Sequence, residues 1–391
     1  MSDRDNLLLS VIIPTRERAE TLPYTLRTAL DQSSRNFEVI VSDNFSQDNT
    51  AEVVRSFSDP RLRLINPGRR VSMCDNWDFA LLHAVGDYVL FIGDDDAIIP
   101  GALDKLEASI LSTRHLAYRW PKPGYLWPMD GKPARVLELP STTQASEVNL
   151  EDLARLVVSM AGWRYPHLPC MYHSAVARCI PDSIRARTGR VFHSACPDVF
   201  MSMAVPVFAK TAIDMGCYVS AVGLSQKSNS GRSDRPNRHT VIDRFVEEYP
   251  DYEIHPSLYP EIPVVLNLIY DSILVAMDKF PEFYGGMKFN YEAMWALLFR
   301  LDSVMYGYNL RRLHIIRKRR QIRRYHPFRV SRFLLYSAFF QSLELRRRMV
   351  SKILAFRRLA NNPPDNIYDF VKMLSPTETG FDAACVTQDH S

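Results

Sequence analysis

The first hundred residues alternate between short apolar runs and segments with helical spacing, and this alternation is the strongest constraint on the fold. Four apolar runs have the composition of buried strands: 7–13, 37–41, 62–65 and 88–92. Three segments between them carry apolar residues at helical spacing: 20–32, 48–57 and 73–84. Because parallel strands need a crossover connection, short strand–helix–strand repeats predict an α/β fold with a mostly parallel sheet covered by helices.

The remainder of the chain changes character twice. Residues 114–200 are less regular, with a Pro- and aromatic-rich stretch that suggests an extended or hairpin insert and a helix at 150–160. Four helical segments follow: 262–278, 290–306, 308–324 and 331–357. We expect an α/β domain over 1–235, a helical and basic region over 236–360, and a weakly ordered tail over 361–391.

Composition excludes several classes of protein. With 391 residues, 46% hydrophobic and 24% charged, the chain is typical of a globular protein and long enough for two domains. The apolar run at the N-terminus is too short for a signal peptide, and the longest later apolar stretch, 264–277, falls short of the roughly 20 residues that span a bilayer. Six scattered cysteines show no zinc-binding spacing. We therefore expect a cytoplasmic protein.

Three adjacent carboxylates, Asp94, Asp95 and Asp96, directly follow the fourth strand. Ligands of parallel sheets bind beyond the carboxyl ends of the strands, and Asp43 ends a neighbouring strand at the same edge. Adjacent carboxylates repel one another and favour a cation, and oxygen ligands without Cys or His suit Mg²⁺ or Mn²⁺. The alternative is a solvated acidic turn, which is common for isolated acidic runs.

Three segments together carry a resemblance to a known family: VIIPTRERAETL, VIVSDNFSQDNT and NWDFALLHAVGDYVLFIGDDDAIIPGAL. In this order and spacing they resemble the nucleotide-sugar half of a family 2 glycosyltransferase with the GT-A fold. The resemblance covers about the first 230 residues. It implies inverting chemistry, a nucleotide-sugar donor and a divalent metal.

The resemblance also assigns roles to individual residues. Pro14, Thr15 and Arg16 would line the nucleoside pocket. Asp43 would accept the uracil N–H with Asn44 beside it, and Asn76 occupies a position where the family often has Asn. Asp94 and Asp95 would contact the ribose and the metal, and Asp96 would be a further ligand or a support. A carboxylate suits the imide N–H of uracil, because a charge-assisted hydrogen bond is strong.

Displacement at the anomeric carbon also needs a base that takes the proton of the acceptor hydroxyl. In the family this base is an Asp at the start of a helix well after the metal motif, and here Asp198 follows Pro197 at such a position. The alternative is that Asp198 only caps its helix. Asp182 and Asp214 are weaker candidates.

The sequence departs from the family pattern at two places. Gly93 replaces a common acidic residue two positions before Asp95, which leaves the metal ligands open. The loop LSQKSNSGRS lacks a common His, so its polar groups are Gln226, Lys227, Ser228 and Arg232, which could contact the diphosphate or lie on a flexible connection.

Two further groups are open to two interpretations. Arg69 and Arg70 could contact the diphosphate or lie in a surface turn. Three histidines, His167, His173 and His193, fall where an acceptor pocket could form, although lone histidines are more often packing residues.

The C-terminal region is strongly basic. Residues 311–358 contain sixteen Lys or Arg and a single acid, Glu344, whereas the remainder of the chain is net acidic. Arg-rich segments with Phe and Leu suit the surface of an anionic membrane, and packing against the acidic body is the alternative. A nucleic-acid partner is disfavoured, because no nucleic-acid-binding motif accompanies the charge.

These observations predict an inverting glycosyltransferase that moves a sugar from a nucleotide-sugar, a UDP-sugar by preference, to a hydroxyl of a glycan or lipid-linked acceptor in surface polysaccharide synthesis. One alternative is a sugar-phosphate nucleotidyltransferase, which ordinarily has a Gly-rich phosphate loop that PTRERAE lacks. The other is a non-catalytic module that binds membrane or nucleic acid through the basic helices.

Overall fold

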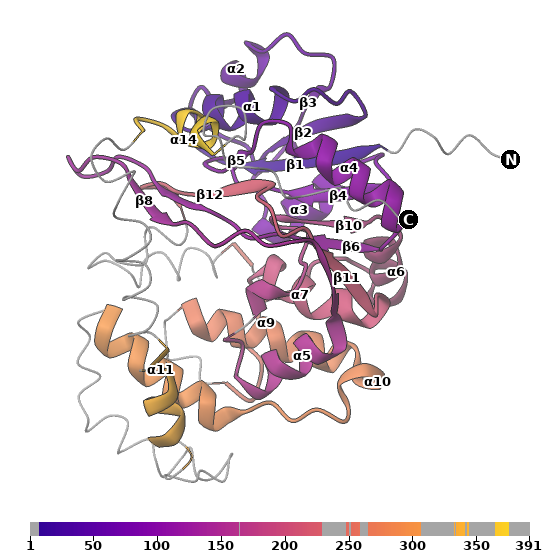
Figure 1. Ribbon diagram of the computed structural model, residues 1–391, viewed down its shortest axis with the longest axis vertical. Helices are drawn as coiled ribbons and strands as arrows, with labels where there is room; N and C mark the ends of the chain where they lie inside the picture. The colour runs from indigo at the N-terminus through magenta and orange to yellow at the C-terminus, as the bar shows by residue number, and fades with distance from the viewer. Residues whose placement is uncertain are drawn as a thin grey trace, which may run out of the picture.

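The computed structural model describes residues 8–228 apart from 164, residues 248–249, 252–258 and 265–305, and residues 332, 334–340, 342–343 and 364–374. Within these residues an eight-stranded sheet and a four-stranded sheet pack with helices (Figure 1). The predicted α/β class, with a mostly parallel central sheet flanked by helices, is confirmed, and so is a helical region toward the C-terminus.

The central sheet begins with the strands that the apolar runs predicted. In spatial order its strands are β3 (Leu62–Ile65), β2 (Phe37–Asp43), β1 (Leu9–Thr15), β4 (Tyr88–Phe91), β10 (Ser174–Ala177), β6 (Ala117–Arg119), β11 (Thr211–Asp214) and β9 (Ser146–Asn149). The first four are parallel, with Thr15 opposite Asp43 in register. Strand β10 runs antiparallel to both of its neighbours, so the sheet is mixed beyond β4.

Alternate residues of the parallel strands bury into two apolar cores, as expected for a sheet covered on both faces. Ile12 and Phe91 belong to one core, and Ile13 and Leu90 to the other. The helices of this part are α1 (Leu22–Leu30), α2 (Thr50–Arg55), α3 (Met73–Leu82), α4 (Ala102–Thr113), α5 (Leu150–Ser159), α6 (Cys179–Thr188) and α7 (Pro197–Phe208). A short 3-10 helix, η1, spans Tyr165–His167.

The Pro- and aromatic-rich insert forms part of the smaller sheet. Its strands are, in spatial order, β5 (Ala97–Ile98), β12 (Ser220–Leu224), β7 (Gly124–Leu126) and β8 (Arg135–Glu138). Strands β7 and β8 form the expected hairpin. Strand β12 pairs with β5 directly after the Asp94–Asp96 run, and this pairing brings residues near 225 to the acidic loop.

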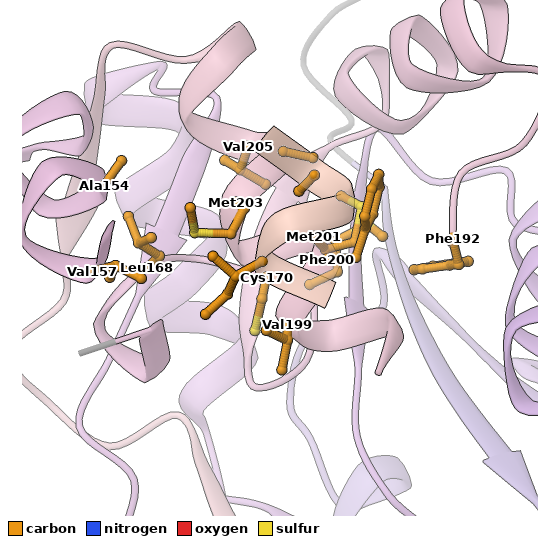
Figure 2. Packing of buried hydrophobic residues seen from close by; sticks show 14 of the residues in the cluster. Ala154, Val157, Leu168, Cys170, Phe192, Val199, Phe200, Met201, Met203 and Val205 are labelled. Carbon is orange, nitrogen blue, oxygen red and sulfur yellow. The ribbon is translucent and has the colours of Figure 1, made fainter. Parts of the chain in front are cut away.

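Helix α7 is buried along most of its length and joins the α/β part to the helical region. Its side chains, among them Phe200 and Met203, lie in one apolar cluster with Leu168 and Phe192 (Figure 2). Helix α9 (Val265–Lys279) packs against α7, and α10 (Pro281–Tyr284) and α11 (Tyr291–Met305) follow it. The helical region therefore shares a core with the α/β part, and the domain boundary at 235 stays a prediction.

The structure corrects the expectation of a weakly ordered tail from residue 361. Residues 364–374 include helix α14 (Ile367–Met373), which packs against α1 (Figure 1). Phe370 is buried and stacks on Tyr125 with ring centroids 5.3 Å apart, and the Tyr125 hydroxyl donates to the Pro364 carbonyl. No sequence pattern indicated this packing, because the apolar residues of the stretch find their partners far away along the chain.

The basic segment 311–358 falls mostly outside the described residues. Of the predicted helix 331–357, residues 334–340 are helical, with Phe340 buried against Trp163 and Leu335 exposed. The predicted helix 308–324 lies outside the described residues. No helix in the described part of the chain is long and apolar enough to cross a membrane.

A matched pair of leucine substitutions tests this packing. Leu26 on α1 is fully buried, whereas Leu82 at the end of α3 is 64% exposed. We expect Leu26→Ala to lower the free energy of unfolding by about 2–5 kcal/mol, because it leaves a cavity, and Leu82→Ala to change it by less than about 0.5 kcal/mol. Urea denaturation measures both values, and equal losses would contradict the assigned core.

Candidate functional site

Three loops at the carboxyl ends of β1, β2 and β4 meet, as predicted from the strand order. The Arg16 amide lies 3.4 Å from Oδ2 of Asp94, which joins the first and third loops. The Glu17 amide donates to Oγ of Ser46 at 2.9 Å, which joins the first and second. The chain therefore places the predicted nucleotide residues and the acidic run around one edge of the sheet.

Asp96 is the most enclosed carboxylate of this edge. It is completely buried and accepts hydrogen bonds from the Gly93 amide (2.5 Å), the Tyr172 hydroxyl (2.7 Å) and the Gly223 amide (2.7 Å). Nε2 of His173 lies 2.9 Å from Oδ2 of the same carboxylate. Burial opposes ionisation, but the imidazole of His173 and these hydrogen bonds hold the pKa of Asp96 below its usual value.

These contacts fix the position of Asp96. Its oxygens are contacted by groups from three parts of the chain, and its role as a further metal ligand or as a support stays a prediction. The same contacts explain Gly93, where a Cβ atom would lie 2.7 Å from Asp96 Oδ2. An acidic side chain there would meet an already occupied carboxylate. A side chain at Gly223 would overlap the Asp95 carbonyl.

Asp94 and Asp95 lie beside a buried cation. Arg18 Nε is 3.6 Å from Asp94 Oδ1, and Arg18 Nη1 is 3.5 Å from Asp95 Oδ2. Asp95 Oδ2 also accepts from the Ser225 amide at 3.2 Å and from the Ser228 hydroxyl. Burial raises the pKa of Asp94, and burial together with the charge of Asp96 raises the pKa of Asp95 to about 6. Both shifts show a negative charge that is incompletely compensated.

The remaining predicted donor residues occupy different positions at this edge. Pro14 and Thr15 end strand β1, and Thr15 is buried opposite Asp43. Asp43 is buried and accepts from the Ser46 amide at 3.1 Å, which shapes its loop. Asn44 bonds the amide and the carbonyl of Val71, and Asn76 exchanges hydrogen bonds with Ser42. Asn44 and Asn76 therefore hold the loops that surround the site.

Arg16 and Arg70 converge on one carboxylate. Arg16 Nη1 lies 2.8 Å from Glu248 Oε2, and Arg70 Nη2 lies 2.9 Å from Glu248 Oε1. The two arginines come from different loops of the α/β part, whereas Glu248 comes from the helical side of the chain. This geometry shows that Arg16 and Arg70 can hold one anionic group together.

Asp198 lies in the first turn of α7, half-buried, and Cys196 rather than Asp198 is the N-cap residue. Burial raises the pKa of Asp198, while the amides of the first turn and the charges of Lys122 and His173 act to lower it. Burial is the main cause that raises the pKa of Tyr165, and the negative charge of Asp198 adds to it. The same charge also contributes to the raised pKa of Tyr172, which lies beside Asp96. Asp198 thus acts electrostatically on Tyr172, whose hydroxyl donates to Asp96.

The other histidines and acids singled out in the sequence have different surroundings. His193 packs on Phe200, and burial lowers its pKa to about 4. His167 is exposed in η1. Asp182 is mostly exposed on α6, and Asp214 pairs with Arg119.

Residues of the loop after β12 contact the first loop. Lys227 Nζ lies 3.1 Å from the Glu17 carbonyl, and Gln226 bonds Asp130. Ser228 donates to Asp95, while Arg232 lies outside the described residues. This loop is therefore attached to the acidic run.

Sequence reasoning missed the importance of Arg18, Tyr172 and Glu248. Arg18 stood in a loop already singled out, and its charge near three carboxylates was the available signal. Tyr172 and Glu248 carried no local signal, because their partners lie 76 and 178 or more residues away.

Within the described residues, no three His, Cys, Asp or Glu side chains converge to hold a metal ion. Asp94 and Asp95 supply two carboxylates that already attract a cation, Arg18. Mg²⁺ is often bound by one or two carboxylates together with substrate phosphates. The residues therefore fit a divalent ion that arrives together with a diphosphate.

Part of this domain matches a known family. Residues 10–133 match the family described as glycosyl transferase family 2. The resemblance drawn from the sequence is thereby confirmed.

Individual relatives match over the same part of the chain. One is a UDP-Glc:alpha-D-GlcNAc-diphosphoundecaprenol beta-1,3-glucosyltransferase of Escherichia coli, 28% identical over 30% of this chain and 46% of its own length. Another is a GalNAc(5)-diNAcBac-PP-undecaprenol beta-1,3-glucosyltransferase of Campylobacter jejuni, 35% identical over 25% of this chain and 33% of its own length. The chain thus matches less than half the length of either relative.

Solved structures with a similar course of the chain include S. aureus TarS 1-349 in complex with UDP-GlcNAc. Its TM-score is 0.48 at 16% identity, over 86% of this chain and 92% of that chain. The mannosyltransferase PcManGT of Pyrobaculum calidifontis, in complex with GDP-Man and Mn²⁺, has a TM-score of 0.41 at 17% identity, over 85% and 86%.

A pair of tyrosine substitutions tests the support around Asp96. Tyr172 donates to a buried carboxylate, whereas Tyr125 donates to a backbone carbonyl. Because hydrogen bonds to charged groups contribute more, we expect Tyr172→Phe to cost about 1.5–3 kcal/mol of unfolding free energy and Tyr125→Phe about 0.5–1.5 kcal/mol. Denaturation at neutral pH measures both, and a larger loss for Tyr125→Phe would argue against the proposed support.

Proposed function

We propose that this protein is an inverting glycosyltransferase that moves a sugar from a nucleotide-sugar, a UDP-sugar by preference, to a hydroxyl of a glycan or lipid-linked acceptor. The observation that carries the proposal is the juxtaposition of the Asp94–Asp95 pair with Arg16 and Arg70 at one sheet edge. Such an edge offers negative groups for a metal and positive groups for a diphosphate. The match of residues 10–133 to glycosyl transferase family 2 supports the same activity.

The nucleoside would bind between the ends of β1 and β2. Pro14, Thr15 and Arg16 would line its pocket, and the buried carboxylate of Asp43 would accept the imide N–H of uracil. Asn44 and Asn76 would act by holding the Val71 and Ser42 backbones that border the pocket. Arg16 and Arg70 would bind the diphosphate as they bind Glu248.

Asp94 and Asp95 would hold a Mg²⁺ or Mn²⁺ ion together with that diphosphate, and Asp96 would keep both carboxylates in position. When bound, the ion supplies a Lewis acid for the charge on the departing nucleoside diphosphate. Arg16 and Arg70 would compensate part of the same charge, because guanidinium groups bind phosphate oxygens in two-point contacts.

Asp198 would take the proton of the acceptor hydroxyl as that oxygen attacks the anomeric carbon. The bond from this carbon to the diphosphate breaks as the new glycosidic bond forms on the opposite face, so the configuration inverts. A raised pKa suits this role, because a base is most effective when its pKa approaches the working pH.

We propose a lipid-linked glycan of surface polysaccharide synthesis as the acceptor. The E. coli and C. jejuni relatives bear names that describe transfer to diphosphoundecaprenol-linked sugars. Peripheral contact of residues 311–358 with the cytoplasmic face of a membrane would deliver such an acceptor. That segment lies mostly outside the described residues, so its contact with membrane stays a prediction from sequence.

The test is a panel of nucleotide-sugars with Mg²⁺ or Mn²⁺, in which binding of the donor and transfer to an acceptor are measured separately. We expect Asp198→Asn to bind donor as the wild type does and to lose transfer by about 10²–10⁴-fold, because the amide cannot accept the proton. Asp182→Asn is the matched control, since Asp182 is mostly exposed on the neighbouring helix α6, and it should retain both activities.

The pH dependence provides a second measurement on the same proteins. Transfer by the wild type should decline as the pH falls through the raised pKa of Asp198, since the protonated carboxyl cannot act as a base. If Asp198→Asn loses donor binding to the same extent as it loses transfer, Asp198 is excluded as the base. Absence of binding for every donor in either metal would refute the enzyme proposal.

Glu248 supplies a further prediction about donor affinity. Because its carboxylate occupies Arg16 and Arg70, the diphosphate must compete with it. Glu248→Gln should therefore tighten donor binding by up to about fivefold, which corresponds to the roughly 1 kcal/mol expected at most for a partly exposed ion pair. Calorimetric titration measures the affinity, and Glu52→Gln, which removes an exposed acid on α2, is the control. Weaker donor binding in Glu248→Gln would show that Glu248 assists the donor.

A further inference from the structure

Arg18 lies at the centre of the proposed donor site, and the proposed function gives it no role. Its guanidinium is 12% exposed and makes four polar contacts. Two are to the Asp94 and Asp95 carboxylates, at 3.6 and 3.5 Å, and two are to the Ser225 hydroxyl and the Lys227 carbonyl, at 2.8 and 2.7 Å. A buried guanidinium thus bridges the acidic pair and the loop after β12.

The backbone fixes this position. The Arg18 amide donates to Oγ1 of Thr50, and the Arg18 carbonyl accepts from the Thr21 and Leu22 amides at the start of α1. Arg18 is therefore set between a strand end and a helix start, where little of its stem can move. The side chain therefore reaches the acidic pair from a backbone that hydrogen bonds hold in place.

The same contacts surround one oxygen of the acidic pair that a metal could use. Asp95 Oδ2 receives the Arg18 guanidinium, the Ser225 amide and the Ser228 hydroxyl. A divalent ion binds a carboxylate oxygen at about 2.0–2.2 Å. At that distance it would displace these donors and lie close to a second positive charge in a poorly hydrated site.

Resting on the proposed function, we propose that Arg18 is the cation of the Asp94–Asp95 pair in the donor-free protein and excludes a divalent metal until the donor diphosphate arrives. The negative charge of the diphosphate then allows the guanidinium and the ion to share the site. Metal and donor enter together, and the Ser225–Ser228 loop is released from Arg18 when they do. Arg18 is thus a positioning residue that sets the order of binding.

The test measures Mn²⁺ binding to the full chain without nucleotide, by electron paramagnetic resonance of free Mn²⁺. The wild type should bind Mn²⁺ weakly, and Arg18→Gln should bind it at least about tenfold more tightly, because a nearby positive charge is removed. Arg18→Lys keeps the charge while losing the fork of the guanidinium, so it should remain as weak as the wild type. Arg61→Gln removes a comparable arginine–aspartate pair, with Asp59, and is the control.

The outcomes separate this inference from the proposed function. Equal Mn²⁺ affinity in wild type and Arg18→Gln, or tight binding in Arg18→Lys, would overturn the role of Arg18. Stoichiometric uptake of Mn²⁺ by the donor-free wild type at micromolar metal would overturn it as well, even if Arg18→Gln fails to fold. Failure of every nucleotide-sugar to bind would instead remove the proposed function, because the measurement on Arg18 uses metal alone.

Discussion

The buried carboxylate of Asp96 is the interaction on which the shape of the site depends. A carboxylate without water is costly unless it is fully hydrogen-bonded. Asp96 meets this condition through Gly93, Tyr172, His173 and Gly223, which belong to three separate parts of the chain. Satisfying one charge therefore brings the end of β4, the approach to β10 and strand β12 to one point, and Asp94 and Asp95 acquire defined positions beside it.

The charged groups of the site face oppositely charged partners within the chain itself. Arg18 faces the Asp94–Asp95 pair, and Glu248 faces Arg16 and Arg70. Arg18 carries positive charge where a metal ion would bind, and Glu248 carries negative charge where a diphosphate would bind. Binding of such a metal–diphosphate complex would then exchange one set of ion pairs for another, and internal partners already offset part of the cost of desolvation. Because these pairs lie on loops carried by a rigid parallel sheet, the exchange can occur without change to the core.

Much of the architecture was predictable from sequence. The four apolar runs became β1 to β4, and the short connections correctly implied parallel pairing, because strand and helix periods are local properties of the chain. The edge at which Asp43 and Asp94 meet followed from strand direction. The expectation for residues 361–391 was wrong over 364–374, since α14 is stabilised by contacts with Tyr125 and α1 that no local pattern reveals.

By itself the sequence determined the order of strands and helices, the edge that bears the acidic run and the family that the segments around this run resemble. Only the tertiary structure decided the surroundings of each carboxylate, since Asp94, Asp95 and Asp96 are adjacent in sequence but differ in their partners. Asp96 is enclosed and Asp95 faces Arg18 and Ser225, because the segments around β10 and β12 bring Tyr172, His173 and Ser225 from far along the chain. Periodicity is set by neighbouring residues, whereas the charge and hydration of a buried group are set by whatever the fold packs around it.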